Sequence, residues 1–196
     1  LLVADDAYGE LTFDGTSLPS FREFLPDQTI LTGSFSKILA PGMRMGWVVA
    51  PPAIMEQLVI TKQASDLHSN YLSQRIAYEY LRTTDIDAKI SAIRAQYKNQ
   101  CELMYSLIQE LMPASVSCTK PRGGMFVWVT LPEGISSMDV FELALKQEVA
   151  VLPGTPFYTD GGGNNTLRLN FSNSTPEKIR TGVGRLAGVI RQLEKH

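Results

Sequence analysis

The sequence predicts an α/β protein in which one long helix joins two sheet-containing parts. Residues 1–4, 29–34 and 45–50 are short, largely apolar runs bounded by polar, glycine or proline residues, which is typical of strands. Residues 85–112 carry apolar side chains at steps of three and four, which indicates a helix. After residue 113, further strand and helix patterns predict a second, smaller sheet with helices of its own.

The first part of the chain alternates strands and helices. The apolar run 1–4 is expected to be a buried parallel strand, which requires neighbours on both sides. Residues 53–62 and 72–81 predict helices, and the prolines just before the first of them suit a helix start. Only part of a sheet can be built from these strands. We therefore expect the chain to be the C-terminal part of a longer protein.

The periodic segment 85–112 is interpreted as a link between two domains. Asp85 is a plausible N-cap, and Pro113 ends the pattern. A helix of this length spans roughly 40 Å at the standard rise, more than one small domain needs. The predicted organisation is therefore a first domain over 1–84, a linking helix over 85–112 and a small C-terminal α+β domain over 113–196.

In the small domain, residues 125–131, 149–152 and 167–171 predict strands. Helices are predicted over residues 136–147 and near the C-terminus. Ser136 with Asp139, and Ser174 with Glu177, have the spacing of a capping box at the start of these helices.

Composition and charge exclude several classes of protein. The net charge is -2 and no basic block is present, which argues against a nucleic-acid partner. The sequence has no signal peptide and no apolar run long enough for a bilayer, so we expect no membrane association and a cytoplasmic location. Cys101 and Cys118 lack metal-ligand spacing, which favours two free thiols and no metal site.

The most informative stretch is residues 34–47, where polar residues and glycines are dense between two apolar runs. Lys37 has no acidic neighbour in this stretch, so its amine can become neutral and attack a carbonyl. Taken alone, this observation favours a solvated surface lysine, because most lysines are exposed. Ser34, Ser36 and Arg44 supply hydroxyl and guanidinium donors of the kind that hold a phosphate.

Two further candidates lie elsewhere in the chain. Asp5 follows an apolar strand, at the end where ligands bind in open α/β sheets, although it could instead cap a turn. Alternation along residues 167–171 places Arg168 and Asn170 on one face and the apolar residues on the other. Arg168 is thus a candidate ligand-binding residue, and the alternative is an exposed strand charge.

Several motifs together resemble a known family. Residues 34–47, S-F-S-K-I-L-A-P-G-M-R-M-G-W, resemble the lysine motif of fold-type I pyridoxal-phosphate aminotransferases of class I/II. Residues 5–8 resemble the D-x-x-Y motif of that family, and 121–131 and 167–171 resemble its C-terminal signatures. The similarity covers essentially the whole chain. It is strongest to the branch with 2-aminoadipate and kynurenine-type aminotransferases and the aminotransferase-like domains of GntR-type regulators.

The resemblance implies a fold and a set of roles. Residues 1–84 would be the C-terminal part of the large domain that binds pyridoxal 5'-phosphate. Asp5 would pair with the pyridine nitrogen of this cofactor and Tyr8 with its phenolic oxygen, while Lys37 would form the Schiff base. The phosphate would be held by Ser34, Ser36 and Arg44. Arg168 would bind the substrate α-carboxylate, and Asn170, Phe157 and Tyr158 would border the substrate pocket.

The implied function is transfer of an α-amino group between an amino acid and a 2-oxo acid by a protein that is a homodimer at full length. The alternative is the effector-binding domain of a GntR-type transcription regulator. The first half of the family's sequence, which completes the cofactor pocket, has no counterpart here. The chain by itself is therefore expected to be poorly active.

Overall fold

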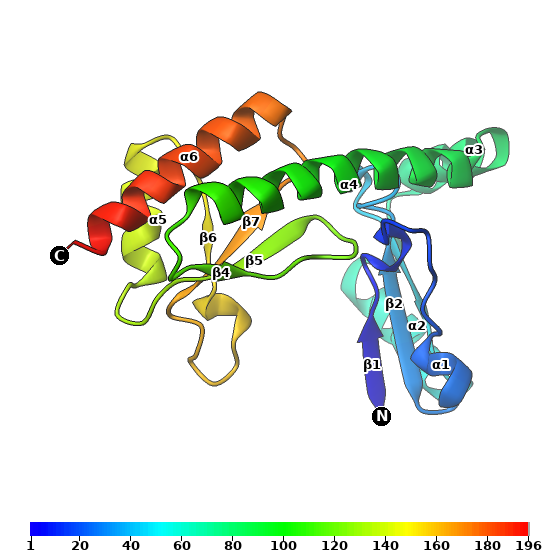
Figure 1. Cartoon of the computed structure of the whole chain (residues 1–196). Coiled ribbons are helices and arrows are strands. Elements are labelled where there is room, and N and C mark those ends of the chain that lie inside the picture. Colours follow the sequence, from blue (N-terminus) through cyan, green and yellow to red (C-terminus); the bar gives the residue numbers. More distant parts are fainter. Residues whose placement is uncertain (196) are drawn as a thin grey trace. The chain divides into compact units, whose positions relative to one another are not determined.

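The computed structural model describes residues 1–195, and the chain divides into two compact units, Leu1–Arg94 and Ala95–His196 (Figure 1). Each unit contains its own sheet, of three strands in the first and four in the second. Helices accompany both sheets, so the architecture is α/β, as the sequence predicts.

The sheet of the first unit has the order β1-β2-β3. Its strands are β1 (Leu2–Asp5), β2 (Thr29–Ser34) and β3 (Gly46–Val49). β1 runs parallel to β2 with Asp5 opposite Thr32, whereas β3 is antiparallel to β2 with Ser34 opposite Gly46. The carboxyl ends of β1 and β2 and the start of β3 therefore meet at one edge of the sheet.

The burial expected for the first strand is not found within this chain. The parallel pairing of β1 is as predicted, but the side chain of Val3 is 64% exposed. Trp47 and Val49 on β3 are also exposed. The described residues therefore leave much of the apolar surface of this sheet uncovered.

The helices that precede the long helix begin with recognisable start signals. Ser20 and Glu23 form a capping box at α1 (Phe21–Phe24), and Asn70 accepts a hydrogen bond at the start of α3 (Tyr71–Thr83). α2 (Pro52–Asp66) begins with proline and extends beyond the predicted end at residue 62. The short 3₁₀ turns η1 (Gly9–Leu11) and η2 (Pro41–Met43) lie in the connections that follow β1 and β2.

The helix α4 (Ile86–Leu111) has nearly the predicted extent. The carboxylate of Asp85 accepts a hydrogen bond from the backbone N–H of Ala88 at 3.0 Å, so it is the N-cap that the sequence indicates. The boundary between the two compact units falls inside this helix, between Arg94 and Ala95. Buried side chains at Cys101, Met104 and Ile108 form the stripe that α4 contributes to the core of the second unit.

The second unit contains an antiparallel sheet with the order β4-β5-β7-β6. Its strands are β4 (Ser117–Cys118), β5 (Phe126–Thr130), β6 (Leu152–Pro153) and β7 (Thr166–Asn170). One face is apolar, and it buries Val127, Val129, Leu167, Leu169 and Phe171. α6 (Pro176–Leu193) and the second half of α4 run along the same side of this sheet (Figure 1).

The second unit differs from two of three local predictions. The strand predicted over 149–152 is reduced to β6, because Val149 to Val151 make no ladder pairs. The cap of α6 is Thr175 rather than Ser174, and its hydroxyl accepts from the N–H of Lys178. Ser136 does cap α5 (Ser137–Lys146), through the N–H of Met138.

Among residues 1–195, no helix combines the length and the apolar character needed to cross a bilayer.

Candidate active site

The first part of the candidate site lies at the edge where β1 and β2 end. Asp5 is the last residue of β1, and its Oδ1 accepts a hydrogen bond from the Thr32 hydroxyl on β2 at 3.1 Å. This cross-strand bond fixes the orientation of the carboxylate. The carboxylate is exposed, so its remaining lone pairs are open to a ligand.

Lys37 lies in the turn that follows β2 and is half-buried. Its Nζ is 5.7 Å from the centroid of the Tyr8 ring, a weak cation–π contact. No salt bridge to Lys37 is found in the part of the chain that the structure describes. The turn thus brings the amine of Lys37 next to the Tyr8 ring.

The turn around Lys37 is ordered by its own backbone. The Ser34 hydroxyl accepts a hydrogen bond from the N–H of Ser36 at 3.1 Å. The N–H of Phe35 donates to the carbonyl of Met45 at 3.1 Å, which continues the pairing of β2 with β3 past the end of the strands. Both ends of the segment 35–45 are therefore tied together beside the sheet edge.

Arg44 ends this segment in a strained conformation. Its φ of 53° and ψ of 46° lie in the left-handed region, which costs a non-glycine residue roughly 1–2 kcal/mol. Its guanidinium Nη1 donates to the carbonyl of Pro41 at 3.3 Å, and the side chain is exposed. Leu67 and Glu148 also have positive φ, so the strain at Arg44 alone does not identify a functional residue.

Glycine at position 33 is required by close packing against the neighbouring strand. A Cβ added to Gly33 would lie 2.2 Å from the Trp47 ring, which crosses over it from β3. A Cβ on Gly46 would similarly meet the carbonyl oxygen of Gly33 at 2.7 Å. These two glycines let β2 and β3 approach with Trp47 between the sheet and solvent.

The residues at this edge fit one side of a phosphorylated aromatic cofactor. They supply a carboxylate, a phenol, an amine, two hydroxyls and a guanidinium, each at a strand end or in the connecting turn. Gly42, two residues before Arg44, is exposed, and an added Cβ there would meet no atom within 4 Å. Six of the seven predicted site residues belong to this edge: Asp5, Tyr8, Ser34, Ser36, Lys37 and Arg44.

The seventh, Arg168, belongs to the second unit. It lies on β7 opposite Trp128 of β5 and Leu152 of β6. Its guanidinium carbon is 4.1 Å from the centroid of the Phe126 ring and 4.2 Å from that of Phe157. The Nε atom of Arg168 is buried and has no hydrogen-bond partner among the described residues.

The sequence predicted only one of the two aromatic residues that lie next to Arg168. Phe157 was among the expected pocket residues, but Phe126 was not. The signal for Phe126 is the alternation along β5, which places it and Trp128 on the face opposite buried Val127 and Val129. Pairing of β5 with β7, which the sequence does not specify, then places Phe126 beside Arg168.

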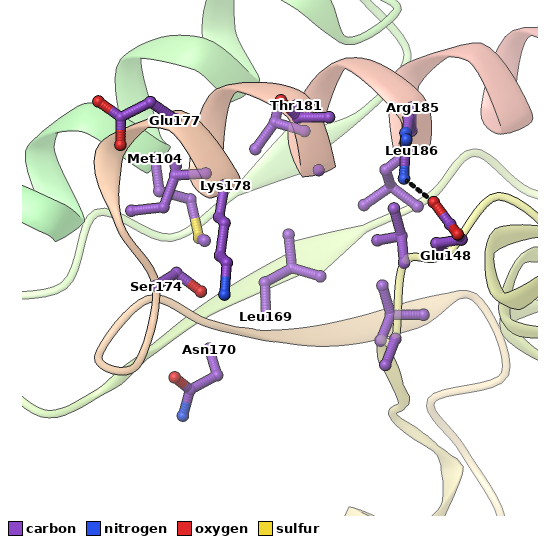
Figure 2. A pocket seen from close by; sticks show the side chains of 16 residues that line it. Met104, Glu148, Leu169, Asn170, Ser174, Glu177, Lys178, Thr181, Arg185 and Leu186 are labelled. Atoms are coloured by element: carbon purple, nitrogen blue, oxygen red, sulfur yellow. Dashed lines mark hydrogen bonds and ion pairs between the residues drawn. The ribbon is translucent and has the colours of Figure 1, made fainter.

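A hollow of ≈ 530 Å³ lies on the other side of β7, beneath α6 (Figure 2). Its lining is mainly apolar, and an ion pair between Arg185 and Glu148 at 2.9 Å closes one end. Leu169, next to Arg168 in sequence, faces this hollow. None of the seven predicted site residues lines the hollow, but Asn170, which was expected to border the substrate pocket, is among its lining residues.

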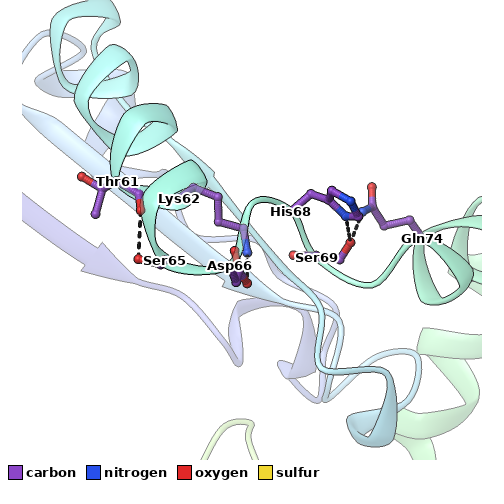
Figure 3. Close-up of polar contacts among 7 residues, drawn as sticks. All are labelled: Thr61, Lys62, Ser65, Asp66, His68, Ser69 and Gln74. Atoms are coloured by element: carbon purple, nitrogen blue, oxygen red, sulfur yellow. Dashed lines mark hydrogen bonds and ion pairs between the residues drawn. The ribbon is translucent and has the colours of Figure 1, made fainter.

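The connection between α2 and α3 is held by local bonds, and not by a ligand site (Figure 3). The His68 ring nitrogen Nδ1 is 2.9 Å from the carbonyl of Ser69, which also accepts from the Gln74 amide. Asn70 caps α3 through the N–H of Ser73. These contacts stabilise the local structure of the connection and the start of α3.

The chain belongs to the aminotransferase class I and II family, which it matches over residues 1–186. It is 42% identical over 196 residues to aromatic-amino-acid aminotransferase 1 of Thermococcus litoralis, with 100% of this chain and 47% of the relative covered. It is 39% identical to 2-aminoadipate transaminase of Thermus thermophilus, with 98% of this chain and 49% of the relative covered.

A solved structure agrees with these relatives. The α-aminoadipate aminotransferase of Thermus thermophilus, complexed with N-(5'-phosphopyridoxyl)-L-leucine, matches with a TM-score of 0.94 and 38% identity. That match covers 98% of this chain and 50% of the solved chain. The chain therefore spans about half the length of the relatives it matches, and the predicted family and fold are confirmed.

Transcription regulators are also similar to the chain, but at lower identity. The HTH-type regulator YdfD of Bacillus subtilis is 29% identical over 195 residues, with 98% of this chain and 40% of the regulator covered. The higher identity to aminotransferases means that the regulator alternative is not favoured.

Proposed function

We propose that the full-length protein is an aminotransferase that uses pyridoxal 5'-phosphate to move an α-amino group between an amino acid and a 2-oxo acid. The observation that carries the proposal is the convergence of Asp5, Tyr8, Lys37, Ser34 and Arg44 at one edge of the first sheet. It is supported by family membership and by the phosphopyridoxyl ligand in a solved relative. The cofactor, when bound, supplies an electron sink for the bonds at the substrate Cα.

Each residue at the sheet edge has a role that its chemistry suits. The Asp5 carboxylate, oriented by Thr32, would hold a proton on the ring nitrogen of the cofactor. The Tyr8 hydroxyl would donate to the phenolic oxygen. Ser34, Ser36 and Arg44 would bind the phosphate by charge-assisted hydrogen bonds.

Lys37 would act as the attacking amine and as a general base. Because no carboxylate pairs with its Nζ among residues 1–195, a ligand can reach this amine without breaking an ion pair. When the substrate amine has displaced Lys37, the Lys37 Nζ would accept a proton from the substrate Cα. It would then donate this proton to the cofactor carbon that is bonded to the substrate nitrogen. Arg168 would orient the substrate through its α-carboxylate.

We further propose that the full-length protein is a cytoplasmic homodimer. Two free cysteines, Cys101 and Cys118, suit a reducing compartment. Large apolar side chains remain exposed on α3, among them Tyr71, Leu72 and Ile76, and such surfaces are typical of contact sites. Sedimentation of the full-length protein at a monomer mass would contradict the dimer.

The central test uses the full-length protein with added pyridoxal 5'-phosphate. We expect wild type to develop a visible absorption band, and borohydride reduction to attach the phosphopyridoxyl mass to the peptide that contains Lys37. Lys37→Ala should lose both signals. Lys62→Ala is the matched control, because Lys62 lies in the same unit but is ion-paired with Asp66 at 2.6 Å.

An unchanged visible band in Lys37→Ala would refute the proposed role of the lysine. A regulator would show the band but no turnover of any amino acid with any 2-oxo acid. Activity measurements on wild type therefore separate the two candidate functions.

A further inference from the structure

The outer face of the second sheet holds Arg168 between two aromatic rings. Register pairs Arg168 with Trp128, and Phe126 lies two residues before Trp128 on the same face of β5. The second ring, Phe157, comes from the turn η3 (Thr155–Phe157) and packs edge-on against Trp128 with centroids 5.6 Å apart. Arg168 on β7 is thus contacted by one ring from β5 and one ring from the turn η3.

The two rings restrict how a ligand can approach Arg168. Phe126 and Phe157 lie at 4.1 and 4.2 Å from the guanidinium carbon, within the range in which aromatic rings attract a cation. Nε is buried and unpaired, so that edge of the group is closed as well. Arg168 as a whole is only half-buried, and from this we infer that a ligand approaches in the guanidinium plane, at the end that carries Nη1 and Nη2.

We propose that Phe126 and Phe157 are positioning residues, which hold Arg168 so that it binds a planar carboxylate end-on through Nη1 and Nη2. The proposal rests on the proposed function, because it assumes that Arg168 binds the substrate carboxylate. Two parallel N–H···O bonds in one plane are the strongest arrangement that arginine and carboxylate can form. The rings remove side-chain freedom before binding, which lowers the entropic cost of that geometry.

The arrangement also defines the ligand class for this position. A carboxylate is planar and can lie between the planes of the two rings, whereas a tetrahedral phosphate or sulfate cannot offer both oxygens in that plane without extending above and below it. The hydrocarbon rings further reduce hydration of the guanidinium, which strengthens its attraction for an anion. The position is therefore expected to select 2-amino and 2-oxo carboxylates over their phosphonate and sulfonate analogues.

The test measures carboxylate binding in full-length protein loaded with pyridoxal 5'-phosphate. In this form a 2-oxo acid has no amino group to receive, so binding occurs without reaction. Titration calorimetry with 2-oxoglutarate, and with phenylpyruvate as second probe, gives the dissociation constant. Phe126→Leu and Phe157→Leu should each weaken binding by about 3- to 30-fold, the equivalent of one cation–π contact.

Matched variants separate positioning from general damage. Phe157→Tyr keeps the ring at an exposed position and should bind within about 2-fold of wild type, while Arg168→Lys should weaken binding by about 100-fold or more. Tyr105→Leu removes an aromatic ring that lies 5.5 Å from another cation, Lys120, and should have no effect. In steady-state kinetics, the Leu variants should raise KM for the amino acid and leave kcat within about 2-fold.

The outcomes distinguish this proposal from the function on which it rests. If Arg168→Lys weakens binding but Phe157→Leu does not, the positioning role is wrong and the carboxylate site stands. If neither change matters, or wild type binds neither probe, both the positioning role and the role of Arg168 fall. If Lys37→Ala keeps the visible band, the proposed chemistry fails, independently of the binding results. Phe157 is exposed, so Phe157→Leu decides the matter even if Phe126→Leu does not fold.

Discussion

At the residue scale, the candidate site depends on side chains that local structure alone does not require. Arg44 adopts left-handed backbone angles that glycine would adopt without strain. Lys37 is half-buried, yet its amine forms no ion pair with a carboxylate among the described residues.

Replacing Arg44 with glycine should separate stability from cofactor binding. Glycine relieves the left-handed strain but adds unfolded-state entropy, so the free energy of unfolding should stay within about 1 kcal/mol of wild type. Loss of the guanidinium should weaken pyridoxal 5'-phosphate binding by about 10-fold or more. Denaturant unfolding and absorbance titration measure the two effects.

Leu67→Gly provides the control for this change. Leu67 also has a positive φ, 66°, but it lies in the turn between α2 and α3. We expect no change in cofactor affinity from Leu67→Gly. Equal weakening in both glycine variants would argue against a phosphate role for Arg44.

The thiol of Cys101 gives a second prediction at this scale. Burial, supported by the nearby Glu102 carboxylate, raises the pKa of Cys101 from 9.0 to about 11. The folded protein therefore keeps this thiol protonated where the unfolded chain ionises it. Its contribution to stability is full below pH 9 and declines as the pH rises toward 11, by about 1.4 kcal/mol per pH unit.

Chemical denaturation at a series of pH values tests the role of Cys101. The free energy of unfolding should decline less steeply between pH 9 and 11 in Cys101→Ala than in wild type. Cys118 is less buried, and burial also raises its pKa. Cys118→Ala should therefore flatten the decline to a smaller extent, and an identical slope in wild type and Cys101→Ala would contradict the assignment.

At the scale of elements, periodicity predicted long helices well and short strands poorly. α4 has the predicted cap and nearly the predicted ends, because many apolar positions and an Asp at the start agree with one another. β4 and β6 have two residues each, and their pairing depends on neighbours that no local pattern specifies. The antiparallel direction of β3 is likewise set by the turn before it.

A proline within α4 should show how much this helix contributes to stability. Ala95 is exposed and lies at the boundary of the two compact units. Ala95→Pro removes one backbone hydrogen bond and clashes with the preceding turn, which should lower the free energy of unfolding by about 3 kcal/mol. Urea unfolding of the full-length protein measures the change.

Asp87→Pro is the matched control for Ala95→Pro. Position 87 lies in the first turn of α4, where proline is tolerated, so the loss should stay below about 1 kcal/mol. Similar losses in both variants would mean that α4 is not continuous across residue 95.

At the scale of the whole molecule, the sequence predicted the family, the fold class and the long helix. It did so because the lysine motif, the D-x-x-Y motif and Arg168 are each short and chemically specific. The sequence also predicted domain boundaries at residues 84 and 112, and this division stays a prediction. The two compact units of the structure meet inside α4. The sequence could not predict the aromatic rings around Arg168, because that grouping depends on strand register and on the path of the turn at Phe157.

The pairing of Ser34 with Gly46 has a consequence for the length of the lysine segment. Because both ends of residues 35–45 are anchored on adjacent strands, the segment is a closed loop whose entropy of closure grows only with the logarithm of its length. Doubling such a loop costs only about 0.6 kcal/mol. Thermodynamic stability therefore tolerates insertions there. An insertion would instead be expected to disturb the contact between the Lys37 amine and the Tyr8 ring.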